Sequence, residues 1–290
     1  MDEEAPLVGD KLVEIPKKNH ARDVHILSSA FLLVFLAYGA VQNLESTLNT
    51  EEDLGTTSLG ILYVSFTFFS MVASMVVRGL GSKNALVLGT TGYWLFLAAN
   101  LKPSWYTMVP ASVYLGFAAS IIWVGQGTYL TSTARSHARD YNLHEGTVIG
   151  KFNGEFWGLF ASHQFVGNLI SLALLSDGTE GSTSGTTLLY VVFLCSMTLG
   201  TILMCFLTKK TDEVESRQPD SSVSFYSNVE GAFAQLKVWQ SASIAVVFFL
   251  SPYISLKAMV AIMLAALCIS YAGFLFLTLK VEKAFSSSSL

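Results

Sequence analysis

Long apolar segments alternate with short polar ones along most of this chain. A helix needs about 20 predominantly apolar residues to cross a bilayer. Eight segments approach or exceed that length: residues 24–44, 57–77, 84–101, 108–130, 145–175, 188–207, 238–253 and 258–279. The pattern therefore predicts an all-α, multi-pass helical membrane protein with eight transmembrane spans, whose first partner is the lipid bilayer.

Composition supports this fold class, and the placement of basic residues predicts an orientation. The chain is 52% hydrophobic and 13% charged, whereas a soluble protein carries about 25% charged residues. All but two of its 17 lysines and arginines, Lys102 and Lys257, fall on the side that holds both chain ends. Cytosolic loops carry the excess of basic residues, so we expect residues 1–23 and 281–290 to be cytosolic tails. The pattern leaves open a plasma membrane or a vacuolar or endosomal one.

A ladder of glycines marks the fifth apolar segment. Gly146, Gly150, Gly154 and Gly158 recur every four residues and fall along one side of a helix. In a bilayer, small residues at this spacing let two helix backbones approach closely, and that contact drives helix association. The ladder therefore predicts a helix-packing face, used either within this chain or against a partner.

Polar side chains at membrane depth are the candidates for a cavity. Such groups are costly in lipid and usually face protein or water. The candidate cavity-lining residues are Gln42, Asn43, Glu45, Gln126, Glu155 and His163. Structural contacts are the alternative for each of them. In particular, Lys151 lies four residues before Glu155, which predicts a structural ion pair near the inner surface.

The sequence carries no signature of catalysis. We find no glycine-rich phosphate loop, no metal-binding cluster and no nucleophile elbow in it. We therefore predict a non-enzyme with no catalytic residues, no cofactor, no metal site and no nucleic-acid partner.

A sparse internal repeat suggests how the spans are organised. Glu145-Gly146 opens the fifth segment, Glu230-Gly231 precedes the seventh, and Lys151 then matches Lys237 after one gap. Membrane carriers of the major facilitator type consist of two six-span halves, and a long cytosolic linker joins them. The segment after the polar linker should then resemble the first span, but it resembles the fifth. This mismatch indicates that the second half lacks about four spans.

The predicted organisation follows from this repeat. Residues 24–208 form one six-span major-facilitator-type lobe, residues 209–229 a cytosolic linker, and residues 230–280 a two-span remnant of the second lobe. The loss of four spans, an even number, leaves the orientation of the remaining ones unchanged. Such a chain would be a splice variant or a gene-model product.

Three motifs together resemble one family. They are Ala37–Ser46 in the first span, Gly125–Thr131 in the fourth and Phe152–Trp157 in the fifth. The chain is similar to the uncoordinated-93-like family, and most similar to its plant-type members in length and loops. The resemblance implies a major facilitator fold, and a role in ion-channel regulation or receptor trafficking. The usual facilitator loop motif is absent, since residues 78–83 hold its place without the aspartate.

Three functions remain open at this point. The first is a non-enzymatic membrane protein that modulates ion, especially potassium, homeostasis or channel or receptor behaviour by binding an ion-channel subunit or another membrane protein. The second is a small-solute or ion transporter of the major facilitator type. The third is a truncated isoform with little activity. A homo-oligomer is compatible with each of them.

Overall fold

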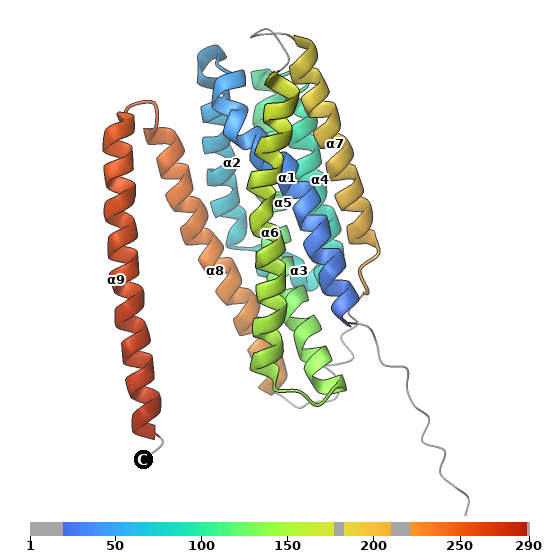
Figure 1. The fold of residues 1–290 in the computed structure, drawn as a ribbon, viewed down its shortest axis with the longest axis vertical. Helices are drawn as coiled ribbons and strands as arrows, with labels where there is room; N and C mark the ends of the chain where they lie inside the picture. The colour runs from blue at the N-terminus through green and yellow to red at the C-terminus, as the bar shows by residue number, and fades with distance from the viewer. Residues whose placement is uncertain (1–19, 177–182, 210–220, 289–290) are drawn as a thin grey trace, which may run out of the picture.

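The computed structural model describes residues 20–176, 183–209 and 221–288, and the described residues form helices without any strand (Figure 1). The predicted N-terminal tail lies almost wholly outside them. A short 3-10 turn, η1 (Glu51–Asp53), precedes α2. The helices are α1 (His20–Leu48), α2 (Leu54–Ser70), α3 (Ala73–Leu80), α4 (Ser82–Ala99), α5 (Trp105–Asp140), α6 (Glu145–Ser176), α7 (Thr183–Cys205), α8 (Ser221–Leu250) and α9 (Leu256–Ser288).

Fewer helices meet the criteria for a membrane span than the eight predicted. Six described helices are long and apolar enough to cross a bilayer, or seven if the bent pair α2 and α3 counts as one span. That pair bends by 69° at Met71 and Val72, within the predicted second span. The predicted third span is α4, which has 18 residues and begins with Ser82-Lys83-Asn84. These polar residues lower its mean hydropathy, so it is not among the six.

The helices run back and forth along one direction, so that α1 begins and α9 ends at the same end of the molecule (Figure 1). The structure therefore supports an even number of passes. Two predicted boundaries also shift. Helix α8 begins at Ser221, inside the predicted linker, and α9 runs to Ser288, inside the predicted C-terminal tail.

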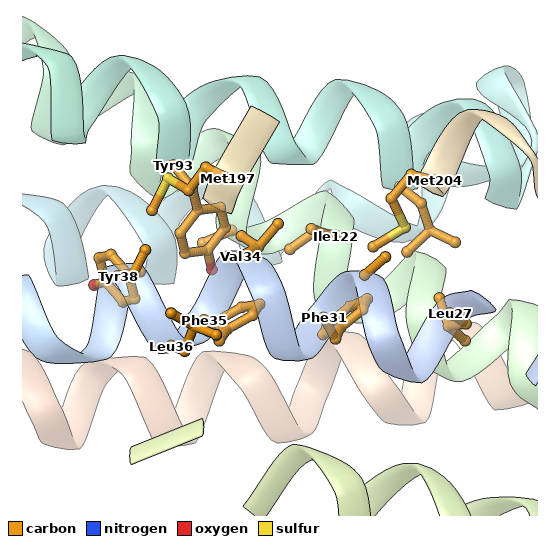
Figure 2. Packing of buried hydrophobic residues seen from close by; sticks show 14 of the residues in the cluster. Leu27, Phe31, Val34, Phe35, Leu36, Tyr38, Tyr93, Ile122, Met197 and Met204 are labelled. Carbon is orange, nitrogen blue, oxygen red and sulfur yellow. The ribbon is translucent and has the colours of Figure 1, made fainter. Parts of the chain in front are cut away.

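Helix α1 is the centre of the bundle. It packs against α6 on one side and against α7 on another, and it also contacts α2, α4 and α5. Figure 2 shows side chains of α1, such as Phe35 and Val34, close to Tyr93, Ile122 and Met197 from α4, α5 and α7. Helix α1 is buried over most of its length because neighbours surround it.

Aromatic rings fill the space between α1, α5 and α6. Phe31 and Phe156 meet edge to face with their centroids 5.1 Å apart, and Phe35 and Phe160 do so at 5.3 Å. Trp123 of α5 lies 5.1 Å from Phe35. Lipid tails are as apolar as these rings, so shape-matched van der Waals packing rather than the hydrophobic effect stabilises this contact in a bilayer.

Glycines allow the closest helix contacts. A Cβ atom on Gly167 of α6 would lie 2.2 Å from the carbonyl oxygen of Leu36 on α1, and one on Gly200 of α7 would lie 2.9 Å from that of Ala30. A Cβ on Gly92 of α4 would lie 2.2 Å from the Cβ of Ala118 on α5. A side chain at any of these three positions would force its neighbours to move.

Helix α8 packs on α2 and α5, although its sequence lies far from theirs. The Thr67 hydroxyl of α2 donates to the Ser241 hydroxyl of α8 at 2.9 Å. A Cβ on Gly60 would lie 2.8 Å from the ring of Phe249, and one on Gly127 would lie 2.6 Å from the ring of Phe233. The side chains of α9 are exposed along residues 256–280 except at Met259, so α9 stands beside the bundle (Figure 1).

Candidate functional site

A pocket of about 240 Å³ lies where six helices meet. The lining residues come from α1, α2, α4, α5, α6 and α8, and about half of them are Phe, Tyr or Trp. They are Phe35, Tyr38, Gly39, Gln42, Leu62, Tyr63, Phe66, Tyr93, Ala119, Trp123, Trp157, Phe160, His163, Gln164, Lys237, Gln240 and Ile244. The volume is somewhat below the range of about 300–1,000 Å³ for pockets that hold drug-sized ligands, so only a small molecule would fit.

Helix α8 supplies the charge of this pocket. The Lys237 ammonium lies 4.2 Å from the centroid of the Trp123 ring, and it donates a hydrogen bond to Gln240 Oε1 at 2.8 Å. The Lys237 side chain is partly buried, and no carboxylate lines the pocket among the residues that the structure describes. The cation is therefore held by an aromatic face and an amide rather than by an opposite charge.

Two of the predicted cavity residues line the pocket. Gln42 Nε2 donates to the Tyr63 hydroxyl at 2.8 Å. His163 Nδ1 lies 2.6 Å from the carbonyl oxygen of Phe160, one turn earlier on α6. Because a carbonyl only accepts, Nδ1 carries the proton and donates to it, and Nε2 remains for other contacts.

Asn43 lies beside the pocket and ties α1 to α6. Its Nδ2 donates to Gln164 Oε1 at 3.1 Å and to Asn168 Oδ1 at 3.2 Å. The three amides are exposed, and Gln164 also lines the pocket. Asn43 therefore connects the pocket to the outer surface of α6.

Glu45 belongs to a different cluster, at the other end of α1 from His20. Asn49 Nδ2 donates to Glu45 Oε1 at 2.9 Å and to Asn100 Oδ1 at 2.7 Å, and Tyr190 lies 3.5 Å from the same Asn100 oxygen. Glu45 and Asn100 are almost fully buried. This Glu45 cluster (Glu45, Asn49, Asn100 and Tyr190) joins α1, α4 and α7, and none of its members lines the pocket.

Gln126 and Glu155 lie away from the pocket as well. Gln126 is 4% exposed within α5, next to the glycine that receives the ring of Phe233. Glu155 Oε1 lies 2.6 Å from His25 Nδ1 of α1, in a partly exposed ion pair whose angles fall outside hydrogen-bonding geometry. The predicted pair with Lys151 is therefore wrong, because α1 brings a closer basic group to this carboxylate.

The glycine ladder does not pack against any other described part of this chain. A Cβ on Gly150, Gly154 or Gly158 would meet nothing within 4 Å, and one on Gly146 would meet only the His144 side chain of the preceding loop. Helix α6 instead turns Val148, Phe152, Phe156 and Gly167 toward the bundle. Of the two alternatives for the ladder, packing within the bundle is not seen among the described residues, and the helix keeps an open face. Its residues are Gly150, Gly154, Trp157, Gly158, Gln164, Phe165 and Asn168.

Sequence reasoning missed the main charged residue of the pocket. The charge pattern placed Lys237 among the cytosolic basic residues because this lysine stands just before the predicted seventh span. In the structure Lys237 lies well inside α8, which begins sixteen residues earlier at Ser221. The signal that could have found it is a lysine within a helical apolar stretch, followed three residues later by Gln240. Within the described segments, no group of three His, Cys, Asp or Glu residues could hold a metal ion.

The long apolar helices and the buried polar clusters between them define an all-α, multi-pass membrane protein. A family described as "Ion channel regulatory protein UNC-93" matches residues 47–231. The chain therefore belongs to the UNC-93 family.

Curated relatives agree with this assignment. UNC93-like protein 3 of Arabidopsis thaliana is 72% identical over 224 residues, which cover 76% of this chain and 48% of that protein. Protein unc-93 homolog A of Homo sapiens is 39% identical over 151 residues, which cover 52% of this chain and 33% of that protein. "Putative potassium channel regulatory protein unc-93" of Caenorhabditis elegans is 36% identical over 156 residues, 53% of this chain and 22% of its own. The chain spans about half or less of the length of these relatives.

Proposed function

We propose that this protein modulates ion homeostasis, particularly that of potassium, by binding an ion-channel subunit in the membrane. The family description refers to ion-channel regulation, and the name of the worm relative refers to potassium channels. The observation that supports binding is the open face of α6, which no other described part of the chain covers.

The chemistry of this face suits a transmembrane helix. Gly150, Gly154 and Gly158 form a flat strip on which a partner backbone could lie closely. The exposed amides of Gln164 and Asn168 follow further along the same face. The oxygens of both amides accept from Asn43. Exposed amides are unfavourable against lipid, and a partner helix with an acceptor side chain would satisfy the N–H groups of Asn168.

Double substitution of the ladder tests the proposal. Leucine at Gly150 and Gly154 would remove the flat strip, and the open space around both positions predicts that the chain still folds and inserts. We expect co-purification with a potassium-channel subunit to be lost. Gly273→Leu is the matched control, because Gly273 of α9 also has open space around it. Unchanged association of the double variant would refute docking through α6, and cross-linking of two tagged copies would instead identify a homo-oligomer.

We also infer that α1–α7 form one lobe of the major facilitator type, and that α8 and α9 are the last two spans of a second lobe. Both termini would then be cytosolic. The coverage of only 48% of the plant relative supports this inference, as does the close packing of α8 on α2 while α9 stands apart. A longer transcript with about four spans between the linker and Glu230 is the expected observation. A gene whose exons run continuously through this region, without a longer transcript, would contradict the inference. If this form is degraded faster than a longer form, it would be an isoform with little activity.

The pocket favours a second candidate function, a small-solute or ion carrier. Gln42 and His163 would line its binding site. Uptake of rubidium or a labelled solute into proteoliposomes, lost in Gln42→Leu, would support this function. A single lobe has no second lobe to move against, so we expect no transport by this form unless it dimerises.

A further inference from the structure

The hydrogen-bond donors of the pocket indicate the charge of a ligand. Lys237 has three N–H donors, and Gln240 accepts one of them. The Tyr63 oxygen accepts from Gln42, which leaves the Tyr63 O–H to donate. Gln164 Oε1 accepts from Asn43, which leaves the Gln164 NH₂ group. Three donor groups, one each from α2, α6 and α8, thus remain for a ligand.

No anionic group among the described residues of the lining balances the Lys237 ammonium. Neither aspartate nor glutamate is among them, and the oxygens of Gln164 and Gln240 already accept hydrogen bonds. Gln42 Oε1 and His163 Nε2 remain as acceptors, but neither carries a negative charge. An uncompensated ammonium in a partly buried site is unfavourable, and a bound anion would relieve it. A cationic ligand would meet repulsion from Lys237. The electrostatics of the lining therefore select an anion.

The remaining walls indicate the shape of that anion. The rings of Trp123 and Trp157 lie nearly parallel, with 9° between their planes and 6.1 Å between their centroids. Phe35 and Phe160 extend this aromatic surface. Flat apolar groups pack well against such rings. A hydrated inorganic anion would leave most of this surface unused.

From these observations we propose that the pocket binds a small monocarboxylate with a flat apolar body. The carboxylate accepts hydrogen bonds from Lys237, Tyr63 and Gln164, and the body lies against Trp123 and Trp157. A charge-assisted hydrogen bond from the ammonium would supply much of the affinity. The proposal concerns binding alone, and it requires neither transport nor association with a channel.

Isothermal titration of the purified full chain in nanodiscs tests the proposal with three probes of similar shape: benzoate, neutral benzamide and cationic benzylammonium. We expect benzoate to bind at least about tenfold more tightly than either other probe, which corresponds to about 1.4 kcal/mol. Equal binding of benzoate and benzamide would overturn the proposal. The absence of benzoate binding at concentrations up to about 10 mM, which corresponds to a binding free energy weaker than about 3 kcal/mol, would also overturn it. Displacement of benzoate by an equal concentration of chloride would overturn the claim that the aromatic walls of the pocket bind the flat body of the ligand. These comparisons need no variant.

Substitutions of the lysine then locate the site. Lys237→Met keeps the length of the side chain without its charge, and we expect it to weaken benzoate binding at least about tenfold. Lys237→Arg keeps the charge and should retain binding. Lys257→Met on α9 is the control, because Lys257 is exposed and outside the pocket. Full benzoate affinity in a folded Lys237→Met variant, as judged by circular dichroism, would overturn the assignment.

Discussion

The contact between α6 and α1 gives the sharpest test of the fold. Gly167→Ala adds one methyl group at a point where its carbon would lie 2.2 Å from the Leu36 carbonyl oxygen and 3.2 Å from the Ala40 Cβ. The obstacle is backbone, so no side-chain rotation can relieve it, and the two helices must move apart. Gly158→Ala on the same helix is the matched control, because its new Cβ would meet nothing within 4 Å.

Comparison of Gly167→Ala with Gly158→Ala isolates the cost of the steric clash in the unfolding free energy. Both variants gain about 0.5–1 kcal/mol of helix stability from replacing a glycine, and this gain cancels in their comparison. Overpacking of a close contact costs about 1–3 kcal/mol. The unfolding free energy of Gly167→Ala should therefore be lower than that of Gly158→Ala by about 1–3 kcal/mol.

Unfolding in mixed micelles, with increasing SDS followed by circular dichroism, measures this difference. We expect Gly158→Ala to be at least as stable as the parent protein. If Gly167→Ala were as stable as Gly158→Ala, the close approach of α6 to α1 would be refuted.

Three further predictions concern other contacts. Asn100→Ala removes an acceptor from the Glu45 cluster and leaves the buried Asn49 amide with one partner fewer, so we expect a loss of about 1–3 kcal/mol in the same assay. Cysteines at Thr67 and Ser241 should form a disulfide upon oxidation because their hydroxyls lie 2.9 Å apart. Cysteines at Thr67 and the exposed Ser243 should not. If neither pair formed a disulfide, the position of α8 would be contradicted. Glu155→Gln breaks a partly exposed ion pair and should change stability by less than about 1 kcal/mol, and a larger loss would show that this carboxylate has a further role.

Hydropathy predicted most helices because a membrane span can be recognised from the apolar character of its own residues. The break between α2 and α3 was missed because Met71 and Val72 continue an apolar run and no proline or glycine marks the bend. The span at α4 was predicted from residue 84, but the helix begins at Ser82 and includes Lys83. Helix boundaries depend on tertiary contacts, which a hydropathy pattern does not contain.

The pocket was predictable only in part. Gln42 and His163 were found because polar residues within apolar segments need a protein or aqueous environment. Lys237 was missed because its place depends on where α8 begins and on which helices α8 meets. The glycine ladder shows the same limit. Four-residue spacing indicates a helix side able to pack closely, but it does not tell which neighbour is present, and Gly167, outside the ladder, makes the contact instead.

The position of α8 has a consequence for the order of events during synthesis. Helices α1 to α7 emerge from the ribosome first, and they hold most of the aromatic walls of the pocket. Lys237 and Gln240 emerge later, and α8 must then find its place beside α2, whose residues entered the membrane long before. A nascent chain that ends before α8 would have the aromatic walls but not the cation. The proposed affinity for carboxylates would therefore arise only after translation has passed α8, at the last stage of assembly.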